Sequence, residues 1–128
     1  MTTLSRHIFG ERRRYIRLEL PVKIAYTVPN GRVIENAVTK NISADGLRFE
    51  THDKALNESS VAELKLDLPG TQNPVHAKGI VVWKKKISLE DRSPYDVGIE
   101  FSEIEEDNKN TFLKFFCDHI YNIKEQKR

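Results

Sequence analysis

Apolar and polar residues alternate along the first part of the chain, with the period of two that is typical of half-buried β-strands. In residues 18–28 every second side chain is apolar, and the pattern is interrupted only by Pro21, which edge strands tolerate. Pro29-Asn30-Gly31 is a turn signal, so residues 33–40 are predicted to return as the second strand of a hairpin.

Four more strands are predicted further along the chain. Residues 46–51 alternate again, residues 61–68 end at Pro69-Gly70, and residues 95–101 form the last strand. The centre of residues 75–87 lacks strict alternation, so this long strand is either buried on both faces or bulged. Six short strands with hairpin-sized connections favour an antiparallel barrel.

The period changes near the C-terminus, where we predict a helix over about residues 103–125. Ser102 and Glu105 fit a capping box, and Asp107 fits an N-cap for a later start. The apolar residues of this segment fall on a helical stripe, namely Phe112, Leu113, Phe116, Ile120 and Ile123. We expect the helix to plug or cover the barrel, because core packing explains this spacing more simply than binding to a partner or a membrane.

Length and composition favour a single soluble domain. The chain has 128 residues, of which 38% are hydrophobic and 31% charged, enough for one modest core. No run of apolar residues approaches the length of ~20 that is needed to cross a bilayer, and we see no signal-peptide pattern. The lone Cys117 permits no disulfide within the chain, and we expect it to pack in the core. A cytoplasmic location is the simplest expectation.

Positive charge is concentrated at the N-terminus, although the net charge of the chain is only +2. Residues 1–17 contain five arginines against Glu11 alone. Like-charge repulsion and few apolar anchors predict a flexible basic arm over residues 1–17, followed by a barrel domain with its helix over residues 18–128. Such an arm attracts anions over roughly a Debye length, ~8 to 10 Å at ordinary salt.

Two short motifs supply the polar groups that an anionic ligand would need. Arg13 and Arg17 present guanidinium forks, which bind phosphate oxygens or the O6/N7 edge of guanine bidentately. Asn41, Ser43 and Gly46 are predicted to lie in a turn, where amide and hydroxyl groups donate and accept hydrogen bonds. Gly46 can adopt a positive φ and lets another group approach the backbone. Together the motifs suit a planar, doubly charged ligand.

The motifs R-x-x-x-R and N-x-S-x-x-G, in this order on a strand-rich chain, resemble those of the PilZ domain family, which binds the bacterial messenger cyclic di-GMP. The likeness runs from about Arg12 through Gly46-Leu47-Arg48-Phe49 and Val82-Trp83 to residues 95–101 and the terminal helix. The resemblance implies a mostly β fold, a six-stranded antiparallel PilZ-like β-barrel with a C-terminal α-helix.

The resemblance also implies roles for single residues. Arg13 and Arg17 would hold the phosphates and guanine edges of cyclic di-GMP. Asn41 and Ser43 would contact a guanine, and Gly46 would keep the turn open beside it. Asn41 stands where the family more commonly has aspartate, and its amide retains base recognition with less charge assistance.

Additional ligand contacts are expected from the residues between and before the motif arginines. Arg12 and Arg14 would touch a phosphate or add positive charge alone. Tyr15 would either stack on a base or pack against the barrel wall. No metal and no cofactor are expected, and cyclic di-GMP is the expected ligand.

We expect a receptor and adaptor, and no enzyme. The four histidines are scattered, Ser43 lacks a G-x-S-x-G elbow, and no glycine-rich phosphate loop precedes a helix. On binding, the arm would fold over the nucleotide and present a changed surface to a protein effector that the sequence does not identify.

Two alternatives stay open. The barrel could be a protein-interaction module with the PilZ fold that binds no nucleotide and docks an acidic partner through its arm. The arm could instead bind nucleic acid through phosphate charge. The second alternative is disfavoured because the sequence shows no evident aromatic platform and no recognition helix with basic residues on one face.

Overall fold

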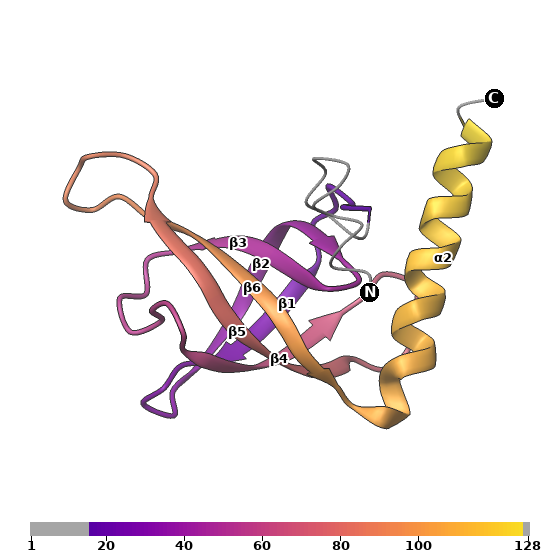
Figure 1. Cartoon of the computed structure of the whole chain (residues 1–128), viewed down its shortest axis with the longest axis horizontal. Helices are drawn as coiled ribbons and strands as arrows, with labels where there is room; N and C mark the ends of the chain where they lie inside the picture. Colours follow the sequence, from indigo (N-terminus) through magenta and orange to yellow (C-terminus); the bar gives the residue numbers. More distant parts are fainter. Residues whose placement is uncertain (1–15, 127–128) are drawn as a thin grey trace, which may run out of the picture.

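The computed structural model describes residues 16–126, with side chains described as far as Ile120. Six antiparallel strands close into a barrel in the order β1-β2-β3-β6-β5-β4, and one long helix follows beside it (Figure 1). The elements are β1 Lys23–Thr27, β2 Val33–Ser43, β3 Gly46–Thr51, β4 Val61–Asp67, β5 Val75–Lys86, β6 Tyr95–Ile104, the short 3₁₀ helix η1 Glu106–Asn108 and α2 Lys109–Gln126. The predicted barrel with a C-terminal helix is therefore confirmed. The predicted arm lies outside the described residues except for Ile16 and Arg17, and its boundary stays a prediction.

The side chains at every second position of the strands point inward and fill the barrel. On β4, Ala62, Leu64 and Leu66 point inward and are almost fully buried, while the residues between them are exposed. Phe49 of β3 and Val81 of β5 join them in the same core. Each fully buried aliphatic or aromatic side chain contributes about 1.5–3 kcal/mol, so the period-two pattern is the main source of the fold's stability.

The first strand is shorter than its sequence pattern predicts. Alternate side chains from Leu18 to Val28 are buried as expected, except that Leu20 is only half-buried, and regular pairing begins only at Lys23. The Thr39 hydroxyl replaces a ladder bond here, because it accepts from the Val22 N–H at 2.9 Å and donates to the Leu20 carbonyl at 2.8 Å. Pro21 has no N–H to offer a regular ladder, so a side chain of β2 completes the pairing.

The long strand β5 is bulged at its centre. Val81 faces Ile99 and Trp83 faces Gly98, so Val82 is the extra residue on the β5 side. Val81 is buried while Val82 is 48% exposed, which excludes burial on both faces. A bulge reorients the side chain that follows it, and here it places Trp83 on the outer wall.

The helix begins at Lys109, later than the predicted position near residue 103. Strand β6 continues pairing with β5 as far as Ile104, so Ser102 lies within a strand and the expected capping box does not form. Two hydrogen bonds hold the connection to β5. The backbone carbonyl of His76 accepts from the Glu105 N–H at 3.0 Å, and the backbone N–H of His76 donates to the side-chain oxygen Oδ1 of Asn108 at 2.8 Å.

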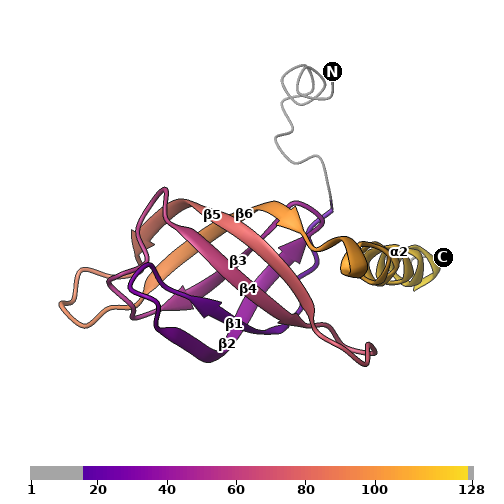
Figure 2. The same cartoon turned by 90° about the horizontal axis from the view of Figure 1, so that it is seen from below.

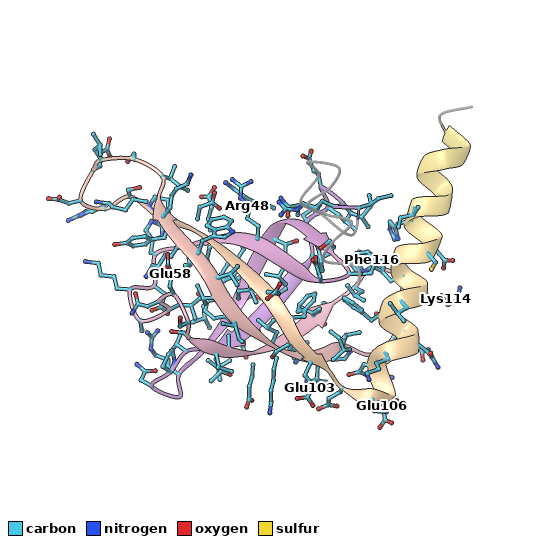
Figure 3. The ribbon with its side chains drawn as sticks, viewed as in Figure 1. Arg48, Glu58, Glu103, Glu106, Lys114 and Phe116 are labelled. Atoms are coloured by element: carbon cyan, nitrogen blue, oxygen red, sulfur yellow. The ribbon has the colours of Figure 1, made fainter. Side chains whose placement is uncertain are left out.

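Helix α2 covers one end of the barrel with one face of its first turns (Figure 2). Phe112, Phe115 and Phe116 join the core, and Figure 3 shows Phe116 on the barrel side and Lys114 on the opposite side. Leu113 is exposed, contrary to the predicted stripe, and Phe115 takes its place. Cys117 is also exposed and does not pack in the core, because it lies on the same outer face as Leu113.

Within the described part of the chain, no helix combines the length and the apolar character needed to span a bilayer.

Candidate functional site

The described members of both sequence motifs meet at one cleft on the outer wall of the barrel. Arg17, Asn41, Ser43 and Gly46 all line it, although Arg17 precedes β1 and the other three lie at the β2–β3 connection. The link between these segments is a two-way bridge, in which Leu18 and Ile42 exchange backbone hydrogen bonds of 2.8 and 3.0 Å. Arg12, Arg13, Arg14 and Tyr15 lie outside the described residues, so their predicted roles stay predictions.

The second motif is mostly strand, not turn as the sequence predicted. Asn41 and Ser43 belong to β2, Gly46 opens β3, and only Ala44 and Asp45 form the turn between them. The turn is closed by the buried Ser43 hydroxyl, which donates to Asp45 Oδ1 at 2.5 Å and accepts from the Asp45 N–H at 3.3 Å. Ser43 therefore shapes the turn, while the Asn41 side chain lies half-buried along the cleft.

Gly46 is required by strand packing rather than by a left-handed turn. Its φ is not positive, unlike those of Gly31 and Gly70. A Cβ at position 46 would overlap the Ile99 carbonyl oxygen of β6. The close approach expected from glycine is therefore present, but the approaching group is the neighbouring strand. Glycine at this position keeps β3 and β6 in contact at the edge of the cleft.

An ion pair fixes the Arg48 side chain, which lines the cleft beside its cross-strand partner Asn41. Arg48 of β3 donates through Nε to both carboxylate oxygens of Asp96, each at 3.0 Å. Its Nη2 also donates to Oδ2 of Asp96 at 2.5 Å. This hydrogen bonding raises the pKa of Arg48 above its ordinary value. The Asp96 side chain is only 8% exposed, so the guanidinium supplies the partner that a buried carboxylate needs. Arg48 is labelled in Figure 3.

The indole of Trp83 is half-buried, lies over Gly98 and lines the cleft. A Cβ at position 98 would overlap the indole ring, so this arrangement needs glycine. The Arg48 guanidinium carbon lies 5.9 Å from the centre of the same ring, within the range of a cation–π contact. Trp83 is the only tryptophan in the chain. Its position makes an aromatic platform at the site.

Sequence reasoning missed Trp83, Arg48 and Asp96 as site residues. All three lie in segments that carried the family resemblance, yet none belongs to the two motifs. One sequence signal was present, because a glycine inside an apolar strand often marks a close approach by another group, and Gly98 is such a glycine. That signal does not name the group that approaches, because pairing with Trp83 depends on the β5 bulge.

The described lining of the cleft is close to electrically neutral. Arg17 and Arg48 are offset by Asp45 and Glu100, which line the same cleft. Its volume of about 120 Å³ is smaller than the ~300–1,000 Å³ of typical small-molecule pockets. A charged ligand of dinucleotide size would therefore need further walls and further positive charge. The sequence offers both in the residues directly before Ile16, which lie outside the described part.

Comparison with protein families gives one match. A model of the PilZ domain family matches residues 11–116, which is most of the chain. No curated protein matches the sequence significantly.

Several solved structures have the same fold. The PilZ domain of YcgR from Escherichia coli with c-di-GMP is 11% identical, and the match covers 91% of this chain and 98% of that one with a TM-score of 0.67. The c-di-GMP complex of MrkH from Klebsiella pneumoniae is 21% identical over 91% of this chain and 56% of that one, with a TM-score of 0.68. The inhibitor of motility MotI/DgrA from Bacillus subtilis is 19% identical over 88% of this chain and 52% of that one, also with a TM-score of 0.68. The chain thus spans about half the length of MrkH and MotI, and at these identities the likeness is one of fold.

Proposed function

Because the chain belongs to the PilZ domain family, we propose that it is a receptor for cyclic di-GMP whose N-terminal arm closes over the nucleotide and presents a changed surface to a protein effector. The observation that carries this proposal is the convergence of Arg17 with Asn41 and Gly46 at one cleft. Two of the similar solved proteins, YcgR and MrkH, were determined with this nucleotide, which supports the choice of ligand.

The cleft offers distinct groups for the distinct parts of such a ligand. The half-buried Trp83 indole suits a guanine ring, and stacking of a base on an aromatic side chain contributes about 1–3 kcal/mol. The Asn41 amide can both donate to and accept from a base edge. Arg17 can bind a phosphate, whereas Arg48 is held by Asp96 and serves to position the wall beside Trp83.

Closure of the arm explains how a neutral cleft would bind a dianion. The arginines at positions 12, 13 and 14 would bring the missing positive charge to the phosphates. Ordering about five to eight arm residues costs roughly 1 to 2 kcal/mol each, and a hydrogen bond to a charged group returns about 1.5 to 3 kcal/mol. Several arginine contacts are therefore needed, and the expected affinity is near micromolar, on the order of −8 kcal/mol.

Titration calorimetry of the full chain with cyclic di-GMP tests this function. Replacement of Arg17 by alanine should weaken binding at least ~10-fold, equivalent to about 1.4 kcal/mol, because a phosphate ligand is lost. Arg32→Ala is the matched control, since Arg32 is exposed at the β1–β2 hairpin and its guanidinium pairs with Asp53 at 3.3 Å. GMP and the linear dinucleotide should bind much more weakly than the cyclic ligand.

The same titration separates the alternatives. A chain that binds no cyclic di-GMP at all would contradict the proposal and favour a protein-interaction module of the same fold. Equal affinities of the Arg17→Ala variant and the parent chain would remove Arg17 from the site. Binding of single-stranded DNA with a steep salt dependence would favour the nucleic-acid alternative.

A further inference from the structure

Three aliphatic side chains form a continuous apolar patch on the outer wall of the barrel, next to the cleft. Val61 is 58% exposed, Ile80 37% and Val82 48%. Val61 of β4 lies directly opposite Ile80 of β5, and Val82 follows Ile80 on the same outward face. We call these three residues the outer patch. Val82 also lines the cleft, so the patch continues the wall of the candidate ligand site.

The patch is confined to the part of β5 that adjoins the cleft. Further from the cleft, the outward residues of the same strand are the charged or polar His76 and Lys78, and Lys78 lies opposite Glu63 of β4. The other large exposed apolar residues among those described lie in separate segments of the chain: Ile16, Val33, Val38, Ile87, Leu89 and Leu113. The outer patch is therefore a local feature with a boundary, and its location beside the cleft needs an explanation.

The chain itself offers an occupant that begins next to the patch. Arg17 lines the same cleft as Val82, so the polypeptide that precedes Ile16 starts within the width of the cleft from the patch. That polypeptide is basic, but it contains an apolar pair, Ile8-Phe9, and a further apolar residue, Leu4. The pair is joined to the cleft residue Arg17 by the seven residues from Gly10 to Ile16.

The chain is long enough for this contact. From β2, where Leu18 is anchored, to β5 there are three strand spacings in the barrel order, or ~15 Å at ~4.8 Å each. The segment between Phe9 and Arg17 spans up to ~26 Å when extended, at ~3.3 Å per residue. Phe9 can therefore reach Val82 and Ile80 while the arginines between them lie over the cleft.

We propose that Ile8-Phe9 dock on the outer patch when the arm closes over its ligand; this docking rests on the proposed function. Apolar burial holds the far end of the arm, and the arginines between the two anchors face the phosphates. A second copy of the chain is a poorer occupant, because three side chains supply far less than the ~1,200 Å² that stable interfaces bury. The tether also gives the arm an effective concentration of about millimolar order, which a separate partner lacks.

A double-mutant cycle on the full chain tests the docking, with cyclic di-GMP affinity measured by calorimetry. Phe9→Ser and Val82→Ser should each weaken binding about 10-fold, equivalent to about 1.4 kcal/mol, and the double variant should also lose about 10-fold because both substitutions remove one contact. Val38→Ser is the matched control, since Val38 of β2 is 47% exposed against 48% for Val82 and does not line the cleft. It should bind like the parent chain.

The outcomes distinguish a failure of the docking from a failure of the proposed function. Additive losses, about 100-fold in the double variant, would overturn the docking even if Val82 contacts the nucleotide directly. A fall in sedimentation mass on Val82→Ser would assign the patch to a second copy and also overturn it. If the parent chain binds the nucleotide and Arg17→Ala weakens binding while the cycle is additive, only the docking fails. If the parent chain binds no nucleotide, the proposed function and the docking fail together.

Discussion

Strand β6 contributes residues to both the cleft and the helix-covered end of the barrel, but the contacts that these residues make are different. On one side of β6, Phe101 meets Phe112 edge to face with ring centres 5.5 Å apart, and Phe112 meets Phe116 at 4.9 Å. On the other side, β6 supplies Gly98 beneath Trp83 and Asp96 for the pair with Arg48. The covered end buries Phe112 and Phe116 almost completely, whereas the cleft leaves the Trp83 indole half-buried.

This difference separates stability from binding. Buried aromatic rings stabilise the fold and offer nothing to a ligand, because ring contacts already fill their surfaces. The half-buried indole contributes less to stability and lines a cleft that could take a planar group. Substitutions at the covered end should therefore change the free energy of unfolding, and substitutions at the cleft should change affinity.

The largest expected effect is at the covered end. Phe112→Ala should lower the free energy of unfolding by about 3–5 kcal/mol, because Phe112 is 2% exposed and its removal leaves a cavity between Phe101 and Phe116. The measurement is urea denaturation followed by circular dichroism. Leu113→Ala is the control, since the neighbouring Leu113 is itself 52% exposed, and this variant should lose about 0.5 kcal/mol or less. Equal losses in both variants would contradict the packing of α2 on the barrel.

A smaller effect is expected at the cleft wall. Gly98→Ala should cost about 1–3 kcal/mol through overpacking and displace the Trp83 indole that its new methyl group overlaps. Because Trp83 is the only tryptophan, its fluorescence spectrum should shift to longer wavelength. Cyclic di-GMP affinity should fall about 10-fold, or about 1.4 kcal/mol, if a base stacks there.

Gly79→Ala provides the matched control for that experiment. Gly79 is also a barrel glycine without room for a Cβ, but the group it would meet is the Ile99 side chain in the interior. Its substitution should destabilise the fold and leave the tryptophan spectrum of the folded protein unchanged. An unshifted spectrum in Gly98→Ala would show that the indole does not rest on Gly98.

The smallest expected effect concerns the pH dependence of stability at Tyr26, which is buried in the barrel interior. Burial raises the pKa of Tyr26 above its ordinary value, and its hydroxyl shares a 2.8 Å hydrogen bond with Thr51. The folded state therefore holds the phenol proton more tightly than the unfolded state. The stability associated with neutral Tyr26 is complete below the ordinary pKa of about 10 and is lost as the pH rises through the higher folded value.

Tyr26→Phe should reduce this alkaline loss and cost about 1 kcal/mol at neutral pH for the missing hydrogen bond. Urea denaturation of both proteins at about pH 8 and about pH 11 measures the difference and cancels the titration of other groups. An identical alkaline loss in the two proteins would contradict the buried position of this hydroxyl.

Strand number, order of elements and the buried faces were predictable because alternation reports local periodicity. The residues of β3 and β4 and the turn at Gly31 match the predicted segments closely. Prediction was wrong where contacts with another element decide the outcome. Thr39 shortens β1, pairing with β5 extends β6 through Ser102, and the helix exposes Leu113 in favour of Phe115.

The residues of the candidate site were likewise predictable only in part. Arg17, Asn41, Ser43 and Gly46 could be named from motif spacing, and they line one cleft. The reason for Gly46 could not be predicted, because the Ile99 carbonyl that excludes a Cβ lies on a strand more than fifty positions away. Trp83 was equally hidden, since its outward position depends on a bulge.

The amino-acid sequence by itself determined the family, the barrel of alternating strands and the two polar motifs, since each is written in residues that are close together in the chain. Only the tertiary structure decided that Trp83 rests on Gly98, that Asp96 holds Arg48, and that an apolar patch adjoins the cleft. These contacts join β3, β4, β5 and β6, and their geometry depends on the register with which the barrel closes. Local periodicity sets which face of a strand is buried, but register and bulges set which residues meet across strands.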